Sequence, residues 1–315
     1  MIGVAAIGTH VPPDRLDNAS RLAELETDAA FIEGKIGVTA VARKPAGTET
    51  SDLCVAAFGD LSRRTGIAAE QLDCLCVVTQ NPDGAGLPHT SAIVHGKLAA
   101  STKCAVFDIS LGCSGFVHAL SLMSAFMTAN GMRRGVLLTA DPYSKIIAPD
   151  DRNTVLLFGD AASATLLEAD PRLPRPGHFR FATDSRWRDA LKSENGRLLM
   201  NGRDVFNYCA QAVPPLIQAC LDAGKVMASD IDAFLLHQGS RFIVDTITRR
   251  LCVPAERVPI EIGRAGNTVS SSIPLMLADR LQDKTWKRML LCGFGVGLSA
   301  AACLLERPAD PEETR

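Results

Sequence analysis

Runs of apolar residues alternate with stretches of helical periodicity along most of the chain. Six apolar runs have the length of buried strands: 72–79, 104–109, 135–140, 164–167, 231–236 and 289–292. Five stretches repeat apolar residues at helical spacing: 50–65, 113–130, 205–223, 240–251 and 271–282. Because strands that alternate with helices are typical of βαβ units, the pattern predicts an α/β protein with a largely parallel sheet in each half.

The two halves of the chain resemble each other in the order of these elements. Each half has a strand that ends at a reactive residue and is followed by a helix, and each half closes with a pair of strands. The polar, proline-rich stretch 170–177 is the natural join. We therefore expect two domains, 1–170 and 171–315, with functional groups at the carboxyl ends of their strands.

One uncharged stretch, 289–305, raises the question of a membrane span. It is shorter than the roughly 20 residues that a spanning helix requires. Three glycines, at 293, 295 and 297, also interrupt it. Two buried strands joined by a glycine turn explain the stretch better, so we expect no membrane span. The first eight residues lack a basic segment, so we expect no signal peptide.

Composition narrows the functional classes. Apolar residues make up 47% and charged residues 22% of the 315 residues, which excludes a disordered or fibrous protein. A net charge of −2 and only 5% aromatic residues give neither the basic field nor the stacking surfaces typical of nucleic-acid binding. The ten cysteines lie mostly in apolar runs without a Cys-x-x-Cys pair. They therefore predict reduced thiols and a cytoplasmic protein.

Cys113 differs from the other cysteines in its setting. A strand ends at Ile109, a short turn follows, and a helix is predicted to begin at Cys113-Ser114-Gly115. Peptide dipoles at a helix amino terminus favour the thiolate and lower the thiol pKa. The alternative is that Cys113 is simply another small buried residue. The strand–Gly–Cys–Ser–Gly–helix setting favours a nucleophile.

Two further positions and a glycine cluster could serve this nucleophile. His237 ends a predicted strand just before Ser240, which can cap the next helix. A core or capping histidine is the alternative for His237, and an ordinary turn residue is the alternative for Asn267. The cluster 293–297 matches no nucleotide-binding pattern, but it could bring a bare backbone amide close to Cys113.

The order Cys113, His237, Asn267 and then Gly-Phe-Gly-x-Gly-Leu-Ser resembles the thiolase-like condensing enzymes, most closely the β-ketoacyl-ACP synthase III family. The similarity covers nearly the whole chain and is carried by several separate motifs, at 108–116, 151–160, 200–202, 237–238 and 266–268. The resemblance implies an α/β fold of the thiolase type. In this fold two duplicated halves contribute two mixed sheets, and helices sandwich the sheets in five layers.

The resemblance also implies an activity for these residues. Cys113 would attack an acyl thioester, and the backbone amides of Cys113 and Gly295 would stabilise the oxyanion. A malonyl thioester would then lose its carboxylate, and its enolate would accept hydrogen bonds from His237 and Asn267 before attacking the acyl-cysteine. No metal and no tightly bound cofactor would be needed. The substrates would be acyl-CoA or acyl-ACP and malonyl-ACP.

Substrate contacts and partners follow from the same resemblance. Pantetheine would contact Phe31, Arg152, Gly202, Phe206 and Gly239. The acyl group would contact Leu87 and Phe158. Phe31 and Lys35 stand where family members usually have Trp and Arg. Acyl carrier protein is the expected partner. We also expect a homodimer, because a duplicated α/β chain leaves a sheet edge that must be covered.

Three alternatives remain open. A degradative thiolase would need a second cysteine at 291, where this chain has leucine, and Cys292 would face the other side of a strand. An acyltransferase that forms an ester or an amide would keep the same Cys–His pair. A non-catalytic partner subunit of a ketosynthase would typically have lost Cys113 or Asn267.

Overall fold

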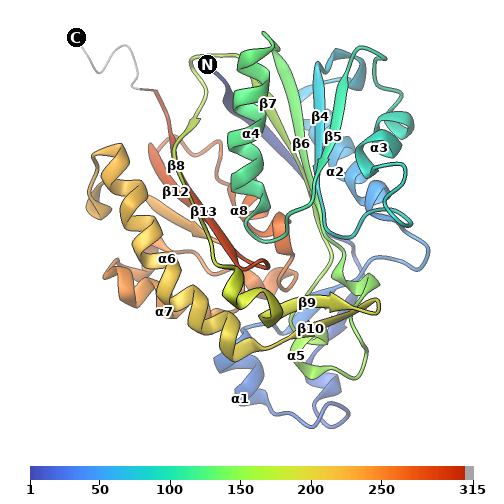
Figure 1. The fold of residues 1–315 in the computed structure, drawn as a ribbon, viewed down its shortest axis with the longest axis vertical. Coiled ribbons are helices and arrows are strands. Elements are labelled where there is room, and N and C mark those ends of the chain that lie inside the picture. Colours follow the sequence, from blue (N-terminus) through green and yellow to red (C-terminus); the bar gives the residue numbers. More distant parts are fainter. Residues whose placement is uncertain (309–315) are drawn as a thin grey trace.

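The computed structural model describes residues 1–308, which form two large sheets with helices between and outside them, and two short strand pairs (Figure 1). The order of strands in the first sheet is β1–β7–β6–β4–β5. These strands are β1 (Gly3–His10), β4 (Cys74–Val78), β5 (Ala105–Ile109), β6 (Arg134–Ala140) and β7 (Ala162–Glu168). The neighbours β6, β4 and β5 are parallel, whereas β1 and β7 pair antiparallel. The prediction of a largely parallel sheet therefore holds only for one side of this sheet.

The second sheet has the order β11–β12–β13–β8. Its strands are β8 (Arg175–Thr183), β11 (Ala233–Leu236), β12 (Arg288–Gly295) and β13 (Ser299–Glu306). Only β11 and β12 are parallel, so the predicted largely parallel sheet is wrong for this half. The reason is the short link between β12 and β13, which permits only an antiparallel hairpin. The uncharged stretch 289–305 thus forms two buried strands, as predicted.

Helices complete five layers (Figure 1). The outer face of the first sheet is covered by α2 (Thr50–Thr65) and α3 (Thr90–Leu98). Between the sheets lie α4 (Gly115–Ala129) and α8 (Ser272–Ala278). Beyond the second sheet lie α6 (Gly202–Gly224) and α7 (Arg241–Leu251). The five-layer arrangement expected from the resemblance is confirmed.

Short elements gather at the lower end of the molecule in Figure 1. They are α1 (Ala29–Phe31), the strand pair β2 (Arg15–Asp17) and β3 (Ala40–Ala42), α5 (Arg152–Val155), and the hairpin of β9 (Leu191–Glu194) and β10 (Arg197–Met200). None of them was predicted from the sequence, because elements of three or four residues carry too little periodicity to be recognised.

The core between the sheets is built on α4. Phe116, Leu120, Met123 and Met127 recur at helical spacing and are fully buried. Full burial of each such side chain contributes roughly 1.5–3 kcal/mol. This helix is therefore packed against both sheets, and it fixes the position of the residues that precede it.

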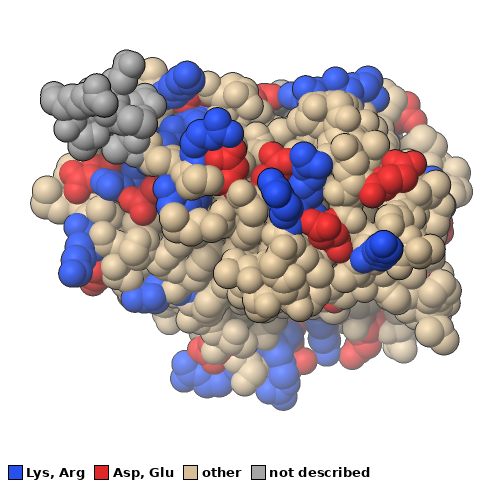
Figure 2. All heavy atoms as spheres, turned by 90° about the horizontal axis from the view of Figure 1, so that it is seen from above, with Lys and Arg blue, Asp and Glu red and all other residues tan. Residues whose placement is uncertain are grey.

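The distribution of charge on the surface and the state of the cysteines agree with what the composition predicts. Basic and acidic side chains are interspersed on the face shown in Figure 2, with a broad uncharged area between them. All ten cysteines are free thiols, and only Cys252 is exposed. Within residues 1–308, no helix has the length and apolarity required to cross a bilayer.

Candidate active site

Strand ends of both sheets meet at one cavity of about 620 Å³. Most of its wall is apolar. Among the described residues it is lined by Phe31, Lys35, Ile36, Cys113, Asn153, Leu157, Phe158, Leu191, Met200, Gly202, Arg203, Val205, Phe206, Cys209, His237, Gly239, Ser240, Phe242, Ile243, Asn267, Phe294 and Gly295. The structure therefore brings the three predicted catalytic residues to the wall of a single cavity.

Cys113 lies in the turn between β5 and α4, and the backbone of β12 closes over it. A Cβ atom on Gly293 would stand 2.6 Å from the carbonyl oxygen of Cys113. One on Gly295, whose φ is +155°, would stand 2.7 Å from the Cys113 Sγ. Only glycine allows this close approach of the backbone. The glycine cluster thus brings β12 against the sulfur.

Burial dominates the electrostatics of this sulfur. It raises the pKa of the Cys113 thiol to about 12, against an opposing hydrogen bond from the backbone N–H of Val296. The sequence prediction of a lowered pKa is therefore wrong. The helix begins only at Gly115, and the cost of desolvating a thiolate outweighs the amide contacts. The thiol must lose its proton to a base when it reacts.

Two backbone groups oppose the rise in the pKa of this thiol. They are the N–H groups of Val296 and of Cys113 itself, whereas the expected pair of oxyanion donors, Cys113 and Gly295, stays a prediction. The missing Cβ of Gly295 makes room for the sulfur. This pair of N–H groups is suited to an oxyanion formed at the carbon bonded to Sγ.

His237 is placed at the end of β11. Its backbone N–H donates to the carbonyl of Cys292 at 2.8 Å, and Nδ1 lies 2.7 Å from Ser272 Oγ. The ring of Phe294 meets the imidazole edge-on, with 5.4 Å between centroids. Burial lowers the pKa of His237 to about 3. The imidazole is therefore neutral at physiological pH.

Asn267 joins the two halves of the chain. Its backbone N–H donates to the carbonyl of Leu157 at 2.8 Å, and its carbonyl accepts from Gly159 at 3.0 Å. The side-chain oxygen accepts from the N–H of Val269 at 2.9 Å, while Nδ2 donates to the carbonyl of Gly239 at 3.3 Å. These bonds fix which way the amide points and leave its second N–H hydrogen for a ligand.

The predicted contact residues Phe31, Gly202, Phe206, Gly239 and Phe158 all line the cavity. Sequence reasoning missed other residues of the wall. Phe242 stacks on Phe206 with 5.0 Å between centroids, and Lys35 Nζ lies 4.2 Å from the centre of the Phe242 ring. The sequence offered one signal that these residues line the cavity: Arg203 is next to Gly202, and Phe242 is close to Ser240. The charged lining residues are Lys35 and Arg203, and none of the described lining residues is acidic.

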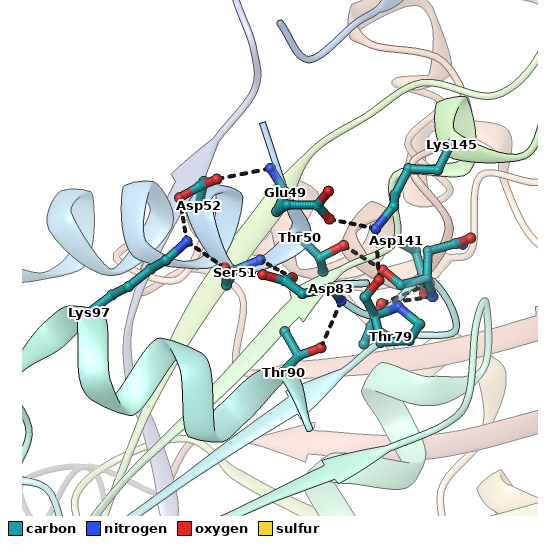
Figure 3. Close-up of polar contacts among 12 residues, drawn as sticks. Glu49, Thr50, Ser51, Asp52, Thr79, Asp83, Thr90, Lys97, Asp141 and Lys145 are labelled. Carbon is teal, nitrogen blue, oxygen red and sulfur yellow. Dashed lines mark hydrogen bonds and ion pairs between the residues drawn. The ribbon is translucent and has the colours of Figure 1, made fainter. Parts of the chain in front are cut away.

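Two predicted contact residues do not line the cavity. Arg152 is exposed, and its guanidinium donates to the carbonyl of Glu26 at 2.7 Å, while Asn153 faces the cavity instead. Leu87 is 92% exposed at the tip of the loop 79–89. Asp83 of this loop accepts hydrogen bonds from the backbone N–H and the hydroxyl of Ser51 (Figure 3). The loop is thereby anchored to α2, with Leu87 outside the cavity.

The low pKa of His237 predicts a pH dependence of stability. An unfolded histidine titrates near 6.5 and the folded one at about 3, so the unfolded state binds more protons between these values. We expect the free energy of unfolding to fall as the pH drops from 7 to 5, by at most about 1.4 kcal/mol per pH unit from this residue. A His237→Gln variant should lose less stability over the same range. Urea unfolding at pH 7, 6 and 5 measures both.

Comparing the wild type with His237→Gln separates the contribution of His237 to the pH dependence of stability from that of other buried groups. Burial raises the pKa of Asp141 to about 7, so the folded state gains protons there as the pH falls, and Asp141 acts in the opposite direction. Asp141 is present in both proteins, so its effect cancels in the difference. Equal slopes for the wild type and His237→Gln would contradict the assignment.

Family models, a relative in sequence and solved structures all resemble this chain. Residues 107–185 match the model of 3-oxoacyl-[acyl-carrier-protein] synthase III, and residues 221–307 match the model of its C-terminal part. A relative named β-ketoacyl-[acyl-carrier-protein] synthase III 2, from Streptomyces coelicolor, is 33% identical over 98% of this chain and 94% of its own. The crystal structure of a 3-oxoacyl-(acyl-carrier protein) synthase from Burkholderia xenovorans is 32% identical. It superposes with a TM-score of 0.90 over 97% of this chain and 94% of its own. The synthase III from Thermus thermophilus is 30% identical, with a TM-score of 0.90 over 98% and 100% of the two chains.

Proposed function

The chain belongs to the β-ketoacyl-[acyl-carrier-protein] synthase III family, and we propose that it loads an acyl group on Cys113 and condenses it with a malonyl thioester. One observation carries this proposal. Cys113, His237 and Asn267, which come from opposite halves of the chain, line one largely apolar cavity. A nucleophile, a neutral imidazole and an oriented amide are the groups that the two half-reactions need.

Acylation uses the sulfur of Cys113. The thiol is protonated before it reacts, because burial raises its pKa. Sγ forms a bond to the thioester carbon, and the oxyanion faces the N–H groups of Cys113 and Val296. When the tetrahedral adduct collapses, the carbon–sulfur bond to the carrier breaks. The carrier thiolate takes up the proton that the Cys113 thiol gives up, and the acyl-enzyme remains.

Condensation uses His237 and Asn267 as hydrogen-bond donors. The malonyl carboxylate leaves as CO₂, and its bonding electrons become an enolate. Nε2–H of the imidazole and Nδ2–H of the amide stabilise the enolate oxygen without burying a second charge. The enolate carbon attacks the acyl-cysteine, and a 3-oxoacyl thioester forms as the Cys113 thiolate is expelled. That thiolate takes up one proton to restore the thiol.

The cavity wall supports a phosphopantetheine carrier. Lys35 and Arg203 supply positive charge for a phosphate, and apolar side chains surround the remainder of a long, uncharged arm. We therefore propose acyl carrier protein as the partner that brings the malonyl group, and acyl-CoA or acyl-ACP as the primer.

Mass spectrometry tests the proposal directly. The protein is incubated with a panel of acyl-CoAs and acyl-ACPs, and its intact mass reports acyl loading. Malonyl-ACP is then added, and formation of 3-oxoacyl-ACP is followed. Loading followed by a 3-oxo product supports condensation. Loading followed by an ester or amide product only with an added alcohol or amine would support the other acyltransferase instead. Absence of loading with every donor would contradict both.

We propose in addition that two chains form a homodimer through the face made by β5, α4 and β8. β5 is an edge strand of the first sheet, yet every one of its residues is half-buried. Phe107 of β5 packs on Phe126 of α4, and Phe181 of β8 packs on His118 of α4, so the three elements form one surface. Leu122 on α4 is 51% exposed there. An unpaired strand edge next to exposed apolar side chains favours burial against a second copy.

A charge placed on this face is expected to separate the chains. We expect Leu122→Glu to sediment as a monomer at micromolar concentration, because a desolvated carboxylate opposes association. The wild type should sediment as a dimer. Met227→Glu changes another exposed apolar residue, which lies elsewhere, and should stay dimeric. A monomeric wild type at this concentration would overturn the proposed dimer, and a dimeric Leu122→Glu would move its interface to another face.

A further inference from the structure

The two hydrogen-bond donors of the cavity depend on the backbone of one strained residue. Val269 is fully buried and has a φ of +52°. This left-handed conformation is unfavourable for a β-branched side chain. The N–H of Val269 donates to the side-chain oxygen of Asn267 at 2.9 Å. A backbone hydrogen bond of Val269 also involves His237. A relaxed Val269 would turn both groups away from their present orientation.

The residues that follow Val269 are tied to the end of β6 in the other sheet. Ser270 Oγ donates to Asp141 Oδ2 at 3.0 Å. Ser271 Oγ lies 2.8 Å from Thr139 Oγ1 and also contacts the carbonyls of Thr139 and Ala161. Since these anchors come from a strand that the rest of the core holds in place, they can maintain an unfavourable φ at the residue before them.

Asp141 is an expensive group to bury, and the condensation mechanism gives it no role. It is 1% exposed and does not line the cavity. Oδ1 accepts from the backbone N–H of Gln80 at 2.7 Å and from Thr79 Oγ1 at 3.4 Å. Figure 3 shows Asp141 beside Thr79, the residue that follows β4. Burial raises the pKa of this carboxyl to about 7. A carboxyl that is buried at this energetic cost needs a compensating role. Its hydrogen bond with Ser270 links Asp141 to the turn that orients the two donors, His237 and Asn267.

We propose that Asp141 and Ser270 are positioning residues, which hold Val269 in its left-handed conformation and thereby orient His237 and Asn267 for decarboxylation. The inference rests on the proposed function, because it concerns the second half-reaction at that site. It predicts an unequal effect on the two half-reactions. Acyl transfer to Cys113 depends on the amides of Cys113 and Val296, whereas the enolate depends on the two donors that Val269 orients.

The first test removes the tie between Asp141 and the turn. In Ser270→Ala we expect kcat for condensation with malonyl-ACP to fall about ten- to a hundredfold, because a misplaced catalytic group costs about this much. The rate of acyl loading, followed by intact mass, should change less than about threefold on the same argument. Ser163→Ala is the matched control. It removes an equally buried hydroxyl that contacts Thr139 at 2.7 Å but does not touch the turn, so both rates should persist.

The second test asks whether the strain at Val269 is what Ser270 opposes. Glycine adopts a positive φ without strain, so Val269→Gly removes the need for the anchor. We expect Ser270→Ala to cost much less in the Val269→Gly background than in the wild type, a coupling that a double-mutant cycle measures. An equal loss in both backgrounds would overturn the proposal.

The outcomes separate this inference from the proposed function. A wild-type protein that yields no 3-oxoacyl product would defeat the proposed function itself. If the wild type condenses, and Ser270→Ala lowers loading and condensation together or lowers neither, the positioning role is wrong. Thermal unfolding of each variant shows whether a common loss reflects a damaged fold.

Discussion

Replacing Cys113 by serine should lower the rate of condensation by more than about a thousandfold, since the nucleophile contributes most of covalent catalysis. A serine hydroxyl at this position has a higher intrinsic pKa than a thiol, and it would lie in the same buried site that already raises the pKa of Cys113 to about 12. Intact mass after incubation with an acyl donor should show no added acyl group.

Cys252→Ser is the matched control for this experiment. Cys252 is the exposed thiol and therefore the position most open to unspecific acylation. The control should load and condense like the wild type. An acyl adduct that persists in Cys113→Ser and disappears in Cys252→Ser would show that the adduct does not report the active site.

Replacing Asn267 by alanine should separate the two half-reactions. We expect acyl loading close to that of the wild type and condensation about a hundred- to a thousandfold slower, the cost of removing one preorganised oxyanion donor. The side chain of Asn267 also bonds to Val269 and Gly239, so the loss includes some disorder of the turn. Intact mass measures loading, and formation of 3-oxoacyl-ACP measures condensation.

Asn130→Ala provides a control outside the cavity. Asn130 lies at the end of α4, where its side chain donates to the carbonyl of Phe126 at 2.8 Å. Both half-reactions should persist in this variant. Condensation that is unimpaired in Asn267→Ala would exclude the amide as an enolate donor, and equal loss of both half-reactions would assign Asn267 a purely structural role.

Local pattern was sufficient to locate the principal helices and the chemistry-bearing turns. α2 begins and ends where the periodicity predicts, and Cys113 and His237 both follow strands, as expected. Neither the antiparallel pairing of β1 and β7 nor that of β8 and β13 could be derived this way, because pairing brings together segments far apart in the chain. Sequence periodicity specifies which residues are buried and carries little information about their neighbours.

The errors in the site have a common physical origin. A helix terminus offers dipoles that favour a thiolate, but burial in the cavity, which the sequence does not reveal, raises the pKa of Cys113 instead. A motif names residues, whereas the direction of each backbone N–H, and with it the choice of oxyanion donor, depends on the local backbone. Leu87, expected in the acyl pocket by resemblance, is exposed in the single chain and does not line the cavity. Burial, backbone direction and loop path all require coordinates.

Each active site draws its nucleophile and both donors from a single chain. In genetic terms, a cell carrying one intact copy and one copy defective at Cys113 would keep working sites in every intact subunit. A subunit that lacks Cys113 and another that lacks Asn267 would not restore each other in a mixed pair. Alleles of these residues should therefore be recessive and should fail to complement one another.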